Sequence, residues 1–185
     1  MNGRALVLLA VVAMSILGAC SRDDPARPTP TDSPAPTPLA PDVVRPLDAT
    51  GSSACSMLGP PDLNAIRLNP QTAVDGSNAI ASACTWESSD GQESLTLVLN
   101  VNTSFELLYA ARDSADAFVE LTIRGHPAVR ENPSDSAICT VHVALAPTQL
   151  FSAEFSTSAT DRPVRSCESA ESAAGAVVDA IAARG

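Results

Sequence analysis

The amino-acid sequence predicts an α+β fold for residues 51–185: a single antiparallel β-sheet of about five to six strands, packed against a C-terminal helix and one or two short helices. Two observations lead to this prediction. Short segments in which apolar and polar residues alternate follow one another through the middle of the chain, with turn signals between them. Near the C-terminus, apolar residues instead recur three and four positions apart, as on one face of a helix.

The first part of this domain should form a short helix and a β-hairpin. Pro60 and Pro61 suit the first turn of a helix, because backbone N–H groups have no helical partner there. Residues 83–88 and 94–102 both alternate, and Asp90-Gly91 between them is a hairpin turn signal.

The middle of the domain should form another short helix over residues 105–113 and then a strand over residues 117–124. The GHP segment of residues 125–127 is expected to turn the chain toward a short strand at residues 128–131. The strands are therefore expected to be joined mostly as hairpins.

The last part of the domain should hold a second hairpin and the longest helix. Residues 138–145 and 149–156 alternate on either side of Pro147, which predicts two paired strands. From Cys167 to Ile181 the apolar residues have helical spacing, and most of the acidic residues lie off that apolar face. This segment is the clearest helix in the sequence.

Residues 1–19 have the layout of a lipoprotein signal peptide. Arg4 and the amino terminus supply positive charge, and residues 5–19 are almost uninterruptedly apolar. About 15 apolar residues fall short of the ~20 that a permanent transmembrane helix needs, so export is the favoured interpretation. The LGAC motif that ends at Cys20 looks like a bacterial lipobox, in which the cysteine thiol is lipidated and the chain is cleaved before it. The alternative is an ordinary secretory signal that happens to contain Cys20.

Residues 20–50 should be a lipidated cysteine followed by a Pro-rich, disordered linker. Eight of the 15 prolines lie between Pro25 and Pro46, so regular secondary structure is not expected there. Serines and threonines between the prolines match O-glycosylated stalks, and an unmodified spacer is the alternative. Two acyl chains would hold the mature protein on the outer face of the cytoplasmic membrane.

Charge and composition exclude several functions. The chain has 11 Lys plus Arg against 21 Asp plus Glu, a net charge of -10, and so acidic a protein does not suit nucleic-acid binding. All the cationic side chains are Arg, which excludes Walker-type phosphate binding and Schiff-base chemistry through a lysine. Closely spaced Cys or His pairs of the kind that bind zinc do not occur, so neither a metal nor another cofactor is expected.

Apart from Cys20, four cysteines remain, and an even number in an exported protein indicates disulfide bonds. Three pairings are possible, and the preferred one joins Cys55 to Cys84 and Cys139 to Cys167. The first bridge would close a local loop around the first predicted helix. For the second, Cys139 should lie at the end of a hairpin from which a short loop returns to Cys167.

Few residues could carry catalysis. His126 is expected to be exposed beside a turn and His142 to face away from the core toward solvent or an edge, and no triad motif surrounds either. Trp86 shares a strand face with Cys84 and is expected to fill the core rather than bind a ligand. Acidic residues of the predicted strands are expected to be solvated surface; these are Glu87, Glu93, Glu120 and Glu154. The domain is therefore predicted not to be an enzyme.

Several motifs, in their order along the chain, resemble a known family. They are a CSML segment at Cys55, a C-x-W strand at Cys84, a GHPA segment at Gly125, a CTVHV strand at Cys139 and a helix led by Cys167. This order is similar to that of actinobacterial lipoproteins with domain of unknown function 3558, and the Lys-free, Ala- and Arg-rich composition fits a GC-rich genome. The resemblance implies a topology and an extracytoplasmic location, and it implies no catalytic residues.

Three functions compete. The leading hypothesis is a non-catalytic, membrane-anchored module that binds an envelope protein or another component of the cell envelope. The alternative is a carrier for a lipid or another small apolar ligand, which would need a closed apolar cavity of about 300 Å³ or more. A third is a hydrolase assembled from scattered acids, which would place two or more carboxyl groups with strongly shifted pKa values in one cleft.

Overall fold

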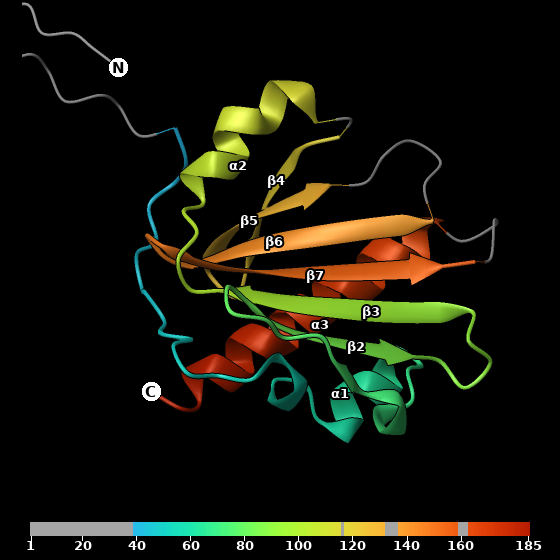
Figure 1. Ribbon diagram of the computed structural model, residues 1–185. Coiled ribbons are helices and arrows are strands. Elements are labelled where there is room, and N and C mark those ends of the chain that lie inside the picture. Colours follow the sequence, from blue (N-terminus) through green and yellow to red (C-terminus); the bar gives the residue numbers. More distant parts are fainter. Residues whose placement is uncertain (1–38, 116, 132–136, 159–162) are drawn as a thin grey trace, which may run out of the picture. The chain divides into compact units, whose positions relative to one another are not determined.

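An antiparallel sheet forms the centre of the structure, and helices cover parts of both its faces (Figure 1). The computed structural model describes residues 39–115, 117–131, 137–158 and 163–185. Seven strands pair in the order β1-β2-β3-β7-β6-β5-β4. The predicted α+β fold is confirmed. The strand that the alternation did not indicate is β1, which has only two residues.

The elements follow the sequence patterns closely. The strands are β1 (Val74–Asp75), β2 (Ser82–Glu87), β3 (Glu93–Asn100), β4 (Val119–Ile123), β5 (His126–Glu131), β6 (Ile138–Ala146) and β7 (Gln149–Thr157). The α-helices are α1 (Pro60–Ala65), α2 (Glu106–Ala111) and α3 (Pro163–Ala182), and the short 3-10 helices are η1 (Ala54–Ser56), η2 (Pro70–Thr72) and η3 (Arg112–Ser114).

The main core lies between α3 and one face of the sheet, which we call the inner face. Alternation places Leu95 of β3 and its register partner Phe155 of β7 on this face, and neither is exposed. Trp86 is 1% exposed in the same core, as its pattern predicts. The helix meets the sheet through small residues such as Ala170 and Ala174, and these let it pack closely on the larger strand side chains.

Two disulfide bonds fasten the helical segments to the sheet, in the predicted pairing. Cys55 bonds Cys84, which ties the segment before α1 to β2. Cys139 bonds Cys167, which ties the start of β6 to the first turns of α3. Cys139 is the register partner of Phe155 near the end of β7, so the hairpin geometry expected from the sequence is the one that forms.

The opposite face of the sheet, which we call the outer face, is covered at one end only. There α2 and the segment before β4 pack on it through aromatic side chains, with the ring of Tyr109 5.1 Å from that of Phe118 and 5.5 Å from that of Phe105. Most of the rest of the outer face is polar and carries cross-strand hydroxyl pairs. Thr85 and Thr96 approach to 3.1 Å, for example.

The turn between β4 and β5 differs from the expected one. Arg124 and Gly125 form it, both with positive φ, and His126 is already paired with Ile123 in the sheet. His126 is therefore buried and not exposed as predicted, and its Nδ1 atom lies 3.0 Å from the carbonyl oxygen of Ala144. Positive φ at two successive positions gives a tight hairpin turn with no further residue in the loop.

Residues 39–50, which the sequence assigns to the linker, have no helix or strand but contact the domain. The backbone N–H of Leu47 donates to the carbonyl oxygen of Leu145 at 2.8 Å, and that of Ala49 donates to Oε1 of Gln149 at 2.8 Å. Both contacts lie beside the turn between β6 and β7. The chain therefore enters the domain at that end of the sheet.

Candidate functional site

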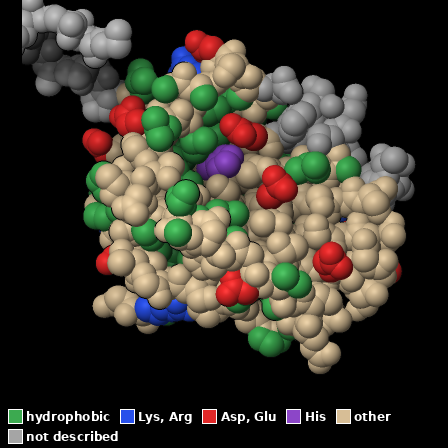
Figure 2. Space-filling model, viewed as in Figure 1, with side chains coloured by type: hydrophobic (Ala, Val, Ile, Leu, Met, Phe, Trp, Pro, Cys, Tyr) green, Lys and Arg blue, Asp and Glu red, His purple; other side chains and the backbone are tan. Residues whose placement is uncertain are grey.

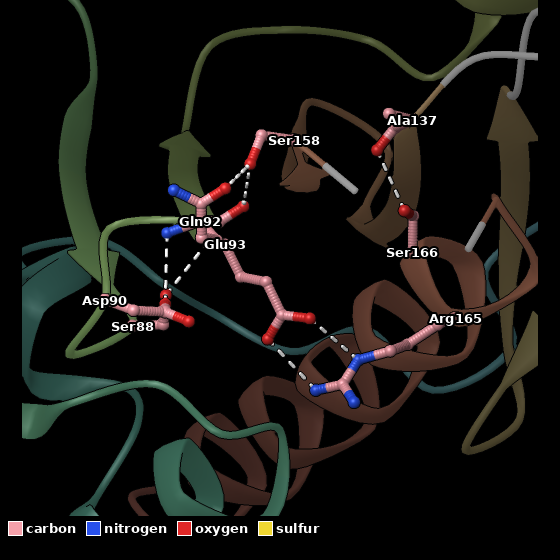
Figure 3. Close-up of polar contacts among 8 residues, drawn as sticks. All are labelled: Ser88, Asp90, Gln92, Glu93, Ala137, Ser158, Arg165 and Ser166. Carbon is pink, nitrogen blue, oxygen red and sulfur yellow. Dashed lines mark hydrogen bonds and ion pairs between the residues drawn. The ribbon is translucent and has the colours of Figure 1, made fainter. Parts of the chain in front are cut away.

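The candidate site is at the opposite end of the sheet, which we call the Glu93 end. Here β2 and β7 finish and β3 and β6 begin, so that residues 88–94, 137–138 and 156–158 lie together. The first turn of α3 also reaches this end, with Arg165 and Ser166 (Figure 3). The β2–β3 turn, the start of β6, the end of β7 and the start of α3 thus place their polar groups in one region.

The turn between β2 and β3 is fixed by its own side chains. The Ser88 hydroxyl donates to Oδ1 of Asp90 at 2.6 Å and accepts the backbone N–H of Glu93 at 3.0 Å. The N–H of Gln92 also donates to Asp90, at 3.1 Å. The two hydrogen bonds that Asp90 accepts lower its pKa below the ordinary value of 3.8, and the bond from Ser88 has the larger effect.

Glu93 forms a bidentate ion pair with Arg165 of α3. Nε of Arg165 lies 3.0 Å from Oε1, and Nη2 donates to Oε2 at 3.1 Å. The Glu93 side chain is 11% exposed and the Arg165 side chain 19%. The prediction that Glu93 is solvated surface is therefore wrong. The carboxylate is held at the start of α3, where the dipole of a helix favours negative charge.

Ser158 and Ser166 join neighbouring segments at this end (Figure 3). The Ser158 backbone N–H donates to the carbonyl oxygen of Gln92 at 2.8 Å, and its hydroxyl also contacts the Gln92 side chain. The Ser166 hydroxyl donates to the carbonyl oxygen of Ala137 at 2.8 Å. With the Cys139–Cys167 bridge close by, β3, β6, β7 and α3 are all cross-connected at the Glu93 end.

Two open hollows border the Glu93 end. One, of about 390 Å³, is on the outer face between the β2–β3 turn and Ser158, and Ser94 and Ser156 lie on its floor. The other, of about 420 Å³, is lined by Arg67, Asp90 and neighbouring turn residues. Both are rich in hydroxyl, amide and carboxylate groups, which suits recognition of a polar partner.

A second polar cluster lies on the outer face, around His142. Its Nδ1 is 2.8 Å from the hydroxyl oxygen of Ser152, and its Nε2 is 3.5 Å from Oε2 of Glu131. The His142 side chain faces away from the inner core, as predicted, but it is only 14% exposed and lies on a central strand instead of at an edge. Burial lowers the pKa of His142 below its ordinary value of 6.5. The negative charge of Glu131 raises the pKa, but its effect is smaller than that of burial.

A serine, a histidine and a carboxylate in contact resemble a nucleophilic triad in composition. Acyl transfer also needs donors for the developing oxyanion, and these are commonly backbone N–H groups. Ser152 is in the middle of β7, a strand paired on both sides, so the N–H groups beside it are engaged in the sheet ladders. The geometry thus supports a packed polar cluster more than a catalytic centre.

The structure brings few of the sequence-predicted residues into one place. Cys20 lies outside the described residues. Trp86 and the four disulfide cysteines are structural, and Glu87 and Glu93 alone among the four predicted surface acids lie at the candidate site. Glu87, Glu120 and Glu154 are exposed as expected. Arg165, Ser94 and Ser156 were not predicted as site residues. For the two serines, a hydroxyl on the polar face of an alternating strand was the available signal.

A comparison with known protein families identifies the family of this chain. The model of a family described as protein of unknown function (DUF3558) matches residues 15–180, which is most of the chain. The chain belongs to the DUF3558 family. No curated protein and no solved structure matches it. Membership in DUF3558 agrees with the resemblance of the cysteine motifs, and it assigns no activity.

Two further observations bear on the chemistry of this DUF3558 protein. Among the residues that the structure describes, no group of three or more His, Cys, Asp or Glu side chains is arranged to hold a metal ion. Within the same residues, no helix combines the length and the apolar character that crossing a bilayer requires.

Proposed function

We propose that this protein is a lipid-anchored, extracytoplasmic binding module that presents the Glu93 end of its sheet to a protein or other component of the cell envelope. The signal peptide and lipobox pattern support the anchor at Cys20. The polar hollows support binding at the Glu93 end. The observation that carries the proposal is that the described chain meets the sheet at one end of the strands and the polar hollows lie at the other end of the same strands.

The first described residue, Leu39, donates its backbone N–H to Oε2 of Glu106 at the start of α2 at 3.1 Å, and the segment then reaches the β6–β7 turn at Leu47 and Ala49. Strand β3 runs from Glu93 at the site to Asn100 near this turn, and at ~3.3 Å per residue its length is on the order of 25 Å. Figure 1 shows the entering segment, in cyan, and the β2–β3 turn at opposite sides of the sheet. A module tethered in this way can turn the Glu93 end away from the membrane.

The Glu93 end is also built to keep its shape. Several bonds hold β3, β6, β7 and α3 together around the hollows. They are the Glu93–Arg165 ion pair, the Cys139–Cys167 bridge and the hydrogen bonds of the β2–β3 turn. A surface that is ordered before binding loses little conformational entropy when a partner docks. This favours recognition by a preformed surface.

The carrier hypothesis has less support in the described residues. The space between α3 and the inner face is filled by side chains with no exposure, among them Val141, Phe151 and Val177. The hollows at the Glu93 end are open to solvent and partly polar. An apolar ligand would need an enclosed apolar site.

Two arginine substitutions on the full lipidated chain test the proposal. Ser89 is exposed and borders a hollow at the Glu93 end, whereas Thr148 is exposed in the β6–β7 turn at the other end. Each variant and the wild type are purified from the native membrane, and the co-purified components are quantified by mass spectrometry. We expect Ser89→Arg to lose a component that Thr148→Arg and the wild type retain. The same set of components in all three samples contradicts the proposal.

A further inference from the structure

A row of four side chains crosses the outer face at the Glu93 end. Glu87 of β2, Ser94 of β3, Ser156 of β7 and Ile138 of β6 follow one another as register partners on neighbouring strands. All four line the hollow of about 390 Å³. We call this row, with its hollow, the trough.

The two ends of the trough differ in chemistry. At one end, the exposed carboxylate of Glu87 makes no hydrogen bond or ion pair with a described side chain. At the other end, the apolar side chain of Ile138 is 43% exposed. A ligand lying along the trough would therefore meet a negative charge at one end and an apolar surface at the other.

The middle of the trough offers hydrogen bonds. The hydroxyl oxygens of Ser94 and Ser156 are 2.8 Å apart, so one of them donates to the other. Each hydroxyl has one proton and two lone pairs, which leaves one proton and several lone pairs for a ligand. Amide groups of an extended peptide backbone supply matching donors and acceptors.

The charges around the trough favour a cationic ligand. Among the described residues that line the trough, none is cationic, and the second carboxylate, Glu93, is already paired with Arg165. Figure 2 views the molecule from the outer face, where acidic side chains are scattered and basic ones show mainly at the margins. The net charge of the whole chain, -10, attracts cationic partners in the same sense.

The spacing of the two ends sets the ligand's length. Three strand intervals separate β2 from β6 in the sheet order, and at ~4.8 Å each they span about 14 Å. An extended peptide covers about 14 Å in four residues, and side chains four residues apart point to the same side. We infer that the trough binds an extended segment of a partner protein, with a Lys or Arg over Glu87 and an aliphatic residue four positions away against Ile138.

This inference deepens the proposed function and rests on it for the location of the partner. It is tested separately by NMR. Synthetic peptides are added to the isotope-labelled full chain in detergent, and the shifts of its amide signals are measured. The probe is Ac-Lys-Thr-Ser-Thr-Leu-NH2, and the comparison peptides replace its lysine by glutamate or shorten its spacing to Ac-Lys-Thr-Leu-NH2. We expect shifts of the Ser94 and Ser156 amide signals, and an affinity for the probe about two- to fivefold above the glutamate peptide, as for an exposed ion pair. The shortened peptide should bind more weakly than the probe.

A variant in which the charge of Glu87 is reversed gives the decisive test. Glu87→Lys should reverse the preference, so that the glutamate peptide binds better than the probe. Glu120→Lys is the matched control. Glu120 is an exposed glutamate on β4, far from β2 along the sheet order, and its substitution should leave the preference unchanged. Ile138→Ser should weaken both five-residue peptides alike.

The inference is overturned if Ser94 and Ser156 show no shifts, if Glu87→Lys keeps the wild-type preference, or if Glu120→Lys reverses it too. These outcomes are distinguishable from failure of the proposed function. A component lost with Ser89→Arg, together with an unchanged peptide preference in Glu87→Lys, would leave the binding module in place and remove the trough as its peptide site.

Discussion

Glu93 and Arg165 are 72 positions apart in the sequence, and their side chains meet through two N–O contacts of 3.0 and 3.1 Å at the start of α3. The pair joins β3 to the helix beneath the hollows of the candidate site. Because both side chains are largely buried, the pair fixes the relative position of sheet and helix there.

Removing one partner of this pair should destabilise the protein strongly. Glu93→Gln leaves the guanidinium of Arg165 buried without a counter-charge, and breaking a buried pair in this way costs about 3 kcal/mol. The free energy of unfolding in urea measures the loss. Asp113→Asn, which breaks the exposed pair of Arg112 and Asp113, is the control and should leave the unfolding midpoint unchanged. Equal effects of the two substitutions would contradict the structural role of Glu93.

Each disulfide bond should contribute to stability through the loop that it closes. The cysteines are 29 positions apart in one bridge and 28 in the other, and loops of this length correspond to roughly 3 to 4 kcal/mol in the chain-entropy account. We expect the double variant Cys139→Ala/Cys167→Ala to lose that amount in urea unfolding. A loss below about 1 kcal/mol would show that the bridge adds little to the packing of α3.

The sequence predicted every strand except the two-residue β1, as well as the bridges and the long helix, because their signals are local or repeat with a period. Cys139 and Cys167 could be paired because alternation defines both the hairpin and the helix that carry them. Glu93 could not be recognised in the same way, since it begins a strand beside a turn and its partner is remote in sequence. His126 was misplaced because Gly125-His126-Pro127 resembles a turn, whereas the actual turn uses a positive φ at Arg124.

The contacts of the segment that leads into the domain could also not be predicted from the sequence. Proline content predicts a linker through residue 50, yet Leu47 and Ala49 within it bond to the sheet. Apolar residues among the prolines were the available signal. Such docking depends on complementary groups at Leu145 and Gln149, which a local pattern does not reveal.

Stability should fall as the pH drops below about 6.5, partly because of His142. Its pKa is lowered by burial, so below 6.5 the unfolded chain binds a proton more readily than the folded one, and folding loses free energy. Urea unfolding of the wild type and of His142→Asn at pH 7.5 and 5.5 measures this. The variant should lose less stability than the wild type over that interval. An equal loss in both proteins would exclude His142 as a source of the pH dependence.

Membrane attachment should depend on Cys20. We expect Cys20→Ala to release the protein from the membrane fraction or to leave an uncleaved precursor, because lipidation and the cleavage that follows both need the thiol. Fractionation and the intact mass of the N-terminal peptide distinguish these results. A variant that is processed and retained like the wild type would remove the lipobox interpretation.

The proposed binding surface is the Glu93 end, remote from the point where the chain enters. Site-specific photo-crosslinking in intact cells tests this proposal, with the photoreactive residue placed at Ser89 in one variant and at Thr148 in the other. We expect a discrete crosslinked product from position 89 that is absent or much weaker from position 148. A product from position 148 alone, or equal products from both positions, would contradict it.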